Sequence, residues 1–347
     1  MIAAEGNADV GSVLKRVDAL ARDGRRLDAI ALVTAANRAR RDPRFEQRLV
    51  HLRHNGFAEL QPGPGLPSWP PPAPAADAFA GTTGLPEVNA DALTAETLAS
   101  GILHHGCLLV RGLVKPDMCA RLRDDIDEAF AALDAHANGA PATETTPWFM
   151  PFTPAAGYSI GPDRKWVTEG GGVWTVDSPR AMFDVIEAFE QMDLAAPLTG
   201  YLGERPALSV KKWTLRRVPV TSGTDWHQDG AFLGDDIRTV NVWLTLTHCG
   251  DTAPGLDVVA RRFHGLAETG TEGAIFDWSV GDPVVERVAD GAPIVRPVFE
   301  PGDALLFDNM FLHRTAVDVS MTEPRYAIES WFFAPSKYPQ DQVPLVF

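Results

Sequence analysis

Trp226-His227-Gln228-Asp229-Gly230 is the most informative stretch of this chain. In an extended strand, residues i and i+2 point to the same face, so a strand end here would hold the His227 imidazole and the Asp229 carboxylate toward one point. A third group comes much later in the chain, because the apolar, strand-like run Leu305–Leu312 is followed by His313. The sequence therefore predicts two imidazoles and one carboxylate gathered around a single metal ion.

This set of ligands favours iron. Two histidines and one carboxylate on one face of an octahedral ion leave positions open for a substrate and for O2, as in non-haem Fe(II) oxygenases. Another metal in the same pocket stays an alternative, because affinity alone does not select iron. An isolated H-x-D unit is also common by chance, and a lone histidine in a strand is more often packed than ligating. The residues around the unit therefore decide the interpretation.

Arg325 is the most telling of these surrounding residues. It opens the stretch Arg325–Phe333, which is typical of a strand with a cation on its inner side. A guanidinium beside a metal ion suits a small dicarboxylate. One end of such a molecule chelates the ion, and the far carboxylate forms a two-pronged pair with the arginine.

Taken together, these parts resemble the Fe(II)/2-oxoglutarate dioxygenases and, within them, the phytanoyl-CoA dioxygenase family. The resemblance covers roughly residues 85 to 335, and its specificity comes from the order and spacing of several individually weak motifs. In chain order these are Trp226–Asp229, Val240–Leu246, Gly255–Val259, Glu300–Phe307, His313 and Arg325.

The resemblance implies a role for each matching residue. His227, Asp229 and His313 would bind iron. Arg325 would hold the distal carboxylate of 2-oxoglutarate, and Trp243 would lie against that co-substrate. Relatives that halogenate lack the carboxylate at the position of Asp229. The resemblance therefore implies that O2 is used for hydroxylation, or for a related desaturation, with release of succinate and CO2.

Two departures from the family pattern concern the pocket. The turn that often reads Pro-Gly-Ser/Thr-His in the family reads Ala260–His264 here. Some relatives carry a serine or threonine two residues after the arginine, where this chain has Ala327. Because the first turn commonly borders the pocket, the primary substrate stays open. An acyl-CoA, a free amino acid, a natural-product intermediate and a peptide are all compatible with the sequence.

The composition is that of a folded, acidic chain. Its 347 residues, 45% of them hydrophobic, suffice for one large domain with an appendage. The net charge of −15 disfavours a nucleic-acid partner. Three scattered cysteines without a C-x-x-C disfavour a disulfide framework or a structural zinc site. We see no leader at Met1–Val10 and no membrane-spanning run, and we expect a reducing, cytoplasmic location that keeps iron ferrous.

Three segments are expected along the chain. Residues 1–60 hold two helices and part of a third, like a fragment of a tetratricopeptide-type repeat. One such repeat cannot bury its own apolar face, so it packs on the main domain or serves a second subunit or a protein partner. Residues 61–80 form a linker, with seven prolines between positions 61 and 76. Residues 81–347 form the oxygenase domain.

The third segment predicts a mainly β fold with flanking helices. Helices are expected near 94–104, over 115–135 and from Pro179 to about Leu202. Strands are expected at 209–218, 238–246, 258–259, 294–299, 304–307, 311–315 and 325–333. Short strands with helices gathered at one end indicate a double-stranded β-helix, a cupin-like jelly roll. The aromatic-rich stretch 136–177 is expected to form a lid and pocket wall, or else to fill irregular space in the core.

Further polar residues keep alternative roles. Asn241 shares a strand face with Trp243, where it would bond the co-substrate or substrate, or be a satisfied buried amide. Of Lys211, Arg216 and Arg217, only some can face inward, and an inward cation would suit a substrate carboxylate.

Two other functions compete with the oxygenase. One is a cupin-like metal protein that needs no 2-oxoglutarate. The other is a non-catalytic protein whose helical N-terminus recruits a partner.

Overall fold

The computed structural model describes residues 9–60, 63, 68–143, 145–234, 236–339 and 341–347. Its helices are α1 (Val10–Arg22), α2 (Arg26–Ala39), α3 (Pro43–Gly56), α4 (Ala95–Ser100), α5 (Pro116–Ala137), α6 (Asp163–Glu169), α7 (Pro179–Gln191), α8 (Ala195–Leu202), α9 (Gly230–Leu233) and α10 (Asp282–Ala289). Local chemistry fixes several of their starts. The Asp42 carboxylate accepts a hydrogen bond from the N–H of Arg44 and so caps α3. Thr94 and Thr97 form a reciprocal capping box at the start of α4.

The strands form two sheets. They are β1 (Glu87–Asn89), β2 (Cys107–Arg111), β3 (Gly172–Trp174), β4 (Ala207–Val218), β5 (Thr239–Thr245), β6 (Gly255–Val259), β7 (Ile294–Val295), β8 (Ala304–Phe307), β9 (His313–Ala316), β10 (Arg325–Phe333) and β11 (Pro344–Val346). The large sheet has the order β1-β2-β8-β5-β10-β4-β11, with β3 paired to β4. The small sheet has the order β7-β6-β9. All residues of β5 and β8 are buried, as expected for strands covered on both faces.

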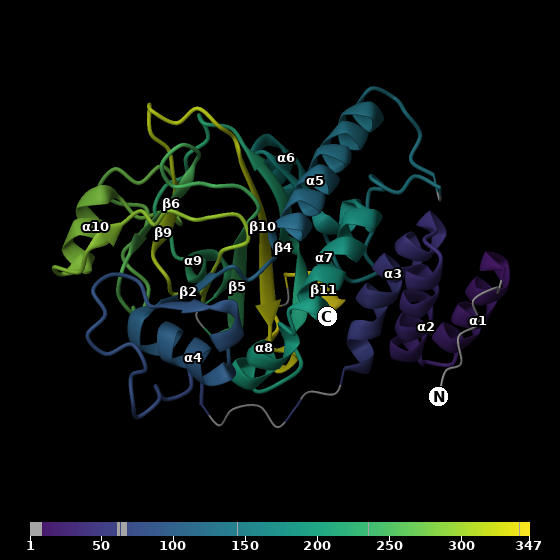
Figure 1. Ribbon diagram of the computed structural model, residues 1–347, viewed down its shortest axis with the longest axis horizontal. Helices are drawn as coiled ribbons and strands as arrows, with labels where there is room; N and C mark the ends of the chain where they lie inside the picture. Colours follow the sequence, from purple (N-terminus) through teal and green to yellow (C-terminus); the bar gives the residue numbers. More distant parts are fainter. Residues whose placement is uncertain (1–8, 61–62, 64–67, 144, 235, 340) are drawn as a thin grey trace.

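The two faces of the large sheet serve different cores. In Figure 1, α5 and α7 lie on one side of β4 and β10, whereas β6, β9 and α10 lie on the other. Side chains alternate accordingly along β10. Ile328 and Phe332 join the core that includes the helices, and Ala327 and Trp331 join the core shared with β6. One face of the central strands therefore lines the interior between the two sheets.

The predicted β core of jelly-roll type with flanking helices is confirmed. β8 and β10 have the predicted bounds, other elements differ by a few residues, and two predictions were clearly wrong in extent. The helix expected from Pro179 to Leu202 is split into α7 and α8, because Asp193 adopts a left-handed φ of 49° between them. The strand expected at 294–299 is limited to Ile294–Val295, since Pro297 has no N–H to continue a ladder.

The aromatic-rich stretch 136–177 contributes part of its aromatic side chains to the core. Phe149, Phe152 and Trp174 are at most 3% exposed and belong to the core under the helices. Trp166, on α6, is 67% exposed and differs from them. Core filling therefore describes these three side chains, whereas Tyr158 and Trp166 are exposed and Trp148 is half-buried.

The N-terminal helices pack on the rest of the chain. Helix α3 contacts α7 and β11, close to the C-terminus (Figure 1). The Arg53 side chain donates a hydrogen bond of 2.9 Å to the carbonyl of Val346. Leu49 is 1% exposed and belongs to the same core cluster as the helix-facing side of the large sheet. An apolar face of the repeat-like helices is thus buried within the chain itself.

The division into residues 1–60, 61–80 and 81–347 stays a prediction, as does a partner or second subunit bound to the outer helices. The part of the linker that the structure describes, residues 63 and 68–80, holds neither helix nor strand. The remaining linker residues and the first eight residues, where no leader was expected, lie outside the described residues. None of the described helices combines the length and apolar character that crossing a membrane requires. Cys107, Cys119 and Cys249 are buried and unpaired.

Candidate metal centre and co-substrate site

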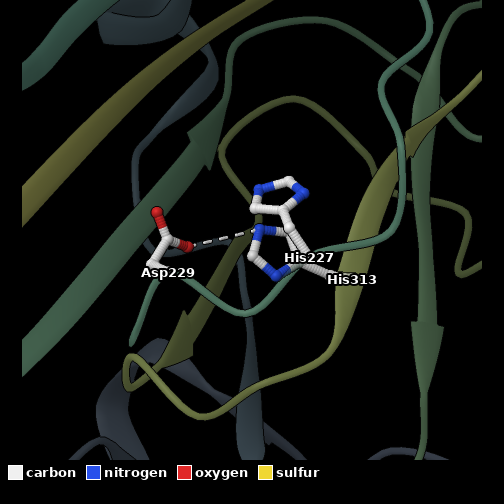
Figure 2. Close-up of side chains that lie close together, drawn as sticks. All are labelled: His227, Asp229 and His313. Atoms are coloured by element: carbon white, nitrogen blue, oxygen red, sulfur yellow. Dashed lines mark ion pairs between the residues drawn. The ribbon is translucent and has the colours of Figure 1, made fainter. Parts of the chain in front are cut away.

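His227, Asp229 and His313 lie together. Each offers one possible ligand atom, and these atoms are within 4.8 Å of one another. Nε2 of His313 is 3.7 Å from Oδ2 of Asp229, and the centroids of the two imidazole rings are 4.4 Å apart. Figure 2 shows the two rings side by side, with the carboxylate facing them. Two nitrogen donors and one oxygen donor at these separations fit a divalent transition metal.

A backbone pairing places the two imidazoles next to each other. The N–H of His227 donates to the carbonyl of His313 over 2.9 Å, and the N–H of His313 donates back over 3.1 Å. Residues directly opposite each other in an antiparallel pair project their side chains from the same face. This bridge joins the segment around His227 to β9, at the edge of the small sheet.

Asp229 reaches the site in a way that the sequence did not indicate. We expected His227 and Asp229 to share the face of an extended strand. The backbone of Asp229 is instead helical, with φ −60° and ψ −22°, immediately before α9. The turn is held by a 2.8 Å hydrogen bond from the N–H of Gly230 to the carbonyl of Asn309. The strand-alternation argument was therefore wrong, although both side chains do reach one point.

Among the described residues, each imidazole forms its hydrogen bond through Nδ1. Nδ1 of His227 lies 2.8 Å from the carbonyl oxygen of Asp225, and Nδ1 of His313 lies 2.9 Å from that of Phe311. A carbonyl can only accept, so each Nδ1 is the hydrogen-bond donor, which leaves Nε2 as the ring atom that can bind a metal. Burial, together with the neighbouring His227, lowers the pKa of His313 to about 4, which keeps that ring neutral at pH 7.

Two amide side chains that the sequence did not single out hold these segments in place. Gln228 is 1% exposed; its Nε2 donates to the carbonyl of Met310 over 2.6 Å, and its Oε1 accepts from the N–H of Ala267 over 2.6 Å. Nδ2 of Asn309 donates to the carbonyl of Gly234 over 2.9 Å. Neither residue is of a type that usually binds a transition metal. Their only signal in the sequence is a position close to the ligands.

Arg325 is buried with part of its guanidinium unpaired. The residue is 0% exposed, and Nη1 donates to the carbonyl of Gly255 over 3.1 Å. Nε and Nη2 have no hydrogen-bond partner among the described residues. Burial lowers the pKa of Arg325 to about 10, so the group is still charged at pH 7. A buried cation with two unpaired donors on one edge fits a carboxylate that would accept both hydrogen bonds.

Trp243 and Asn241 lie on the same sheet face as this guanidinium. The Arg325 guanidinium is 5.1 Å from the centroid of the Trp243 ring. Asn241 is 4% exposed, and its Oδ1 has no partner within the part of the chain that the structure describes, so the satisfied amide that we considered is not observed at that atom. Asn241 is paired in register with Phe307, whose ring centroid is 4.8 Å from that of His313. A continuous interior face thus runs from the histidines to the arginine.

A family model described as Phytanoyl-CoA dioxygenase (PhyH) matches residues 103–325. This stretch is well over half of the chain, and it contains the three clustered residues and ends at Arg325. The chain belongs to the phytanoyl-CoA dioxygenase family. It is therefore a 2-oxoglutarate-dependent oxygenase, and its clustered His227, Asp229 and His313 could hold a metal ion.

Three solved structures match this chain at low sequence identity. EctD from S. alaskensis, solved with 2-oxoglutarate and 5-hydroxyectoine, has a TM-score of 0.44 and 15% identity, over 67% of this chain and 73% of that one. AviO1 from Streptomyces viridochromogenes has a TM-score of 0.44 and 14% identity, over 72% of this chain and 98% of that one. SnoK, a non-heme alpha ketoglutarate dependent carbocyclase from nogalamycin biosynthesis, has a TM-score of 0.47 and 12% identity, over 72% of this chain and 87% of that one. These scores are too low to add to the family assignment. No curated protein matches the chain.

In this member of the dioxygenase family, two cations of β4 face the interior. Nζ of Lys212 is 3.6 Å from Oδ1 of Asp229, and Arg216 pairs with Glu329 over 3.2 Å. The neighbouring Lys211 and Arg217 pair with carboxylates of α6 and α5. Of the cations considered from the sequence, Arg216 is thus the inward one. Lys212 was missed, although it lies four positions before Arg216 and so shares its strand face.

Proposed function

We propose that this oxygenase hydroxylates an unactivated C–H bond of a small organic or peptidyl substrate, using Fe(II), 2-oxoglutarate and O2 and releasing succinate and CO2. The observation that carries the proposal is the cluster of His227, Asp229 and His313 on the same interior as a buried, half-unpaired Arg325. The carboxylate of Asp229 favours hydroxylation, since halogenation needs its place on the metal for a halide.

Each residue has a distinct task in this proposal. His227 and His313 present neutral Nε2 atoms to the ion, and Asp229 presents a carboxylate oxygen. If bound there, Fe(II) with 2-oxoglutarate and O2 would supply the oxidising power to break a C–H bond, coupled to decarboxylation of 2-oxoglutarate. Arg325 holds the distal carboxylate of 2-oxoglutarate through Nε and Nη2. Trp243 and Asn241 line the space beside that carboxylate, where the unpaired amide oxygen of Asn241 can accept a hydrogen bond.

Burial gives these residues a further effect. His313 and Arg325 are 7% and 0% exposed, so the inner side of the site is shielded from bulk water. A carboxylate that pairs with Arg325 there is attracted more strongly than it would be in water, because the surrounding dielectric is low.

The proposal is tested by mixing the purified protein with Fe(II) and 2-oxoglutarate without oxygen and recording the weak visible absorption band of the chelate. Admission of O2 should then give succinate, at a rate that the right substrate raises. With isotopically labelled O2, the product should gain one labelled oxygen atom. Loss of two hydrogen atoms would instead indicate desaturation.

A pair of variants controls the test. Asp229→Ala should lose the absorption band and succinate formation, whereas Asp236→Ala should keep both, because the Asp236 side chain is 80% exposed and pairs with Lys337. Failure of the wild-type protein to take up Fe(II), or Fe(II) uptake without any 2-oxoglutarate consumption, would leave a metal protein of another kind.

A further inference from the structure

An aromatic wall stands beside the half-buried His227. The ring of Trp278 is 5.7 Å from the imidazole centroid and nearly perpendicular to it, and the ring of Phe232 is stacked at 6.3 Å. Trp278 in turn stacks on Phe276, with centroids 4.9 Å apart and planes 4° from parallel. Phe276 is 50% exposed, Phe232 is 36% exposed and the adjoining Ile275 is 72% exposed. Apolar side chains of this size are normally covered, so the wall has surface available for a ligand.

The wall is fixed relative to the metal centre. Its loop is tied down by Asp225, whose Oδ2 accepts 2.7 Å hydrogen bonds from the N–H of Ile275 and from Oγ of Ser279. The N–H of Val280 donates to the carbonyl of Trp226 over 2.8 Å, directly before His227. The wall and His227 are therefore parts of one hydrogen-bonded unit, and an apolar body lying on the wall is held at a set position relative to the ion.

Lys212 stands at the join between this wall and the metal centre. Its Nζ is 4.0 Å from the centroid of the Phe232 ring and 3.6 Å from Oδ1 of Asp229, and its side chain is 28% exposed. The neighbouring Lys211 pairs with Asp163 over 3.0 Å and belongs to a different environment. In a chain of net charge −15, an ammonium group at this point is a distinctive feature of the site.

Two other charged groups near the wall and the inner face have partners within the chain. Asp225 accepts the hydrogen bonds that hold the wall, and Glu329 pairs with Arg216. The ammonium of Lys212 has Asp229 as its carboxylate partner, and Asp229 is a metal ligand in the proposed function. A divalent ion would take up part of the negative charge of Asp229. Lys212 would then have less attraction to its own chain and more for an outside anion.

We propose that the primary substrate is an organic acid, with an apolar ring or hydrocarbon body that packs on Phe232, Phe276 and Trp278 and an anionic group that meets Lys212. This inference rests on the proposed function, because it names the substrate class of the same site. It also sets an order of events: the acid binds more tightly after the metal, since Fe(II) competes for Asp229.

Calorimetry under nitrogen, on the full-length protein loaded with Fe(II) and 2-oxoglutarate, tests the proposal. The probes are 4-phenylbutanoate, 4-phenylbutan-1-ol and 4-phenylbutylamine, with octanoate as the hydrocarbon counterpart. An acid should bind about tenfold more tightly than the alcohol, and the amine should bind least, because a hydrogen bond to a charged group strengthens binding by about that factor. Removal of Fe(II) should weaken binding of the acid more than binding of the alcohol. Equal binding of acid and alcohol, preference for the amine, or no binding of either acid overturns the proposal.

Matched variants separate the contributions. Lys212→Gln should abolish the preference for the acid, whereas Lys211→Gln should keep it. Phe276→Ala should weaken binding of the acid and of the alcohol equally, by about fivefold, because part of a half-exposed aromatic contact is lost. Trp166 is an exposed tryptophan on α6, and Trp166→Ala should change neither of the two affinities. If Lys211→Gln and Lys212→Gln behave alike, Lys212 does not select the substrate.

The outcomes distinguish this proposal from the proposed function. Absence of the Fe(II)–2-oxoglutarate absorption band refutes the oxygenase chemistry and the inference built on it. An intact band without acid selectivity refutes the substrate class alone. Fe(II) affinity in Lys212→Gln should be at least that of the parent, because Fe(II) and the Lys212 ammonium compete for Asp229. A loss of Fe(II) affinity there would mean that Lys212 orients Asp229 and does not recognise a substrate.

Discussion

His227 and His313 exchange both of their backbone hydrogen bonds, over 2.9 and 3.1 Å. The two histidines are therefore placed by a main-chain pairing between segments far apart in the sequence. This relationship ties the candidate metal centre to the small sheet, since β9 begins at His313 and also pairs with β6. Whatever holds the two segments together should also set the affinity for the metal.

Gln228 is the first test of that dependence. Its amide ties the Asp229 segment to Met310 and Ala267, so Gln228→Leu leaves an N–H and a carbonyl without their partner. We expect Fe(II) affinity to fall by about 10- to 100-fold, the usual effect of losing a group that supports metal ligands. Anaerobic Fe(II) titration measures it. The exposed Gln191→Leu is the control, and unchanged affinity in Gln228→Leu would show that the segments hold without this amide.

Replacing Arg325 should weaken the binding of 2-oxoglutarate but should not destabilise the protein without it. In Arg325→Met, the KM for 2-oxoglutarate should rise by about 30-fold or more, because a buried charge pair loses one member. Without 2-oxoglutarate the variant should be at least as stable as the parent, since a buried and half-unpaired charge has been removed. Thermal unfolding with and without 2-oxoglutarate measures both effects. Arg217→Met, on the neighbouring strand, is the control; a stabilising effect of 2-oxoglutarate on Arg325→Met would exclude the pairing.

Local patterns predicted the ligands better than they predicted the geometry. His227, Asp229, His313 and Arg325 are recognisable by type and order, and the apolar runs of β8 and β10 gave their bounds. The conformation of Asp229 was not predictable, because the helical turn before α9 depends on a hydrogen bond from Gly230 to the distant Asn309.

The other errors share this origin. Lys212 was missed because a run of two lysines gives no sign of which one faces inward until the partner strand is known. The Phe276–Trp278 wall lies in a loop with no periodic pattern, and its position follows from tertiary hydrogen bonds to Asp225. Interactions between distant segments, and not propensities, decide each of these features.

Asp125 makes stability depend on pH. Burial and the nearby Asp184 raise the pKa of Asp125 from 3.8 to about 7, against the smaller opposing effects of Arg41 and Arg121. Between these two pH values the folded state binds more protons than the unfolded state, so this group makes the protein less stable as pH rises through that window. Asp125→Asn should remove the penalty and raise the free energy of unfolding at pH 8 by about 1–3 kcal/mol, with a gain roughly half as large or less at pH 5, because the penalty builds up between the two pKa values.

Denaturant unfolding at the two pH values measures this effect. Asp124→Asn is a suitable control, because the Asp124 side chain is 70% exposed. An equal gain at pH 5 and pH 8 would show that the effect of Asp125→Asn does not come from ionisation.

Leu49 tests whether the N-terminal helices are part of one cooperative unit. The side chain is 1% exposed, in a core that includes the helix-facing side of the sheet. Leu49→Ala should lower the free energy of unfolding by about 3 kcal/mol in a single transition of the whole protein. Lys15→Ala, at an exposed position of α1, should change it by no more than about 0.5 kcal/mol. A separate early transition, with the main one unchanged, would make the helices an independent module.

The most direct measurement is a crystal structure of the protein grown without oxygen in the presence of 2-oxoglutarate and Mn(II) as a stand-in for Fe(II). One ion should be bonded to His227, Asp229 and His313, with the far carboxylate of 2-oxoglutarate on Nε and Nη2 of Arg325. An ion bound elsewhere, or the three side chains turned apart with no shared ion, would contradict the account.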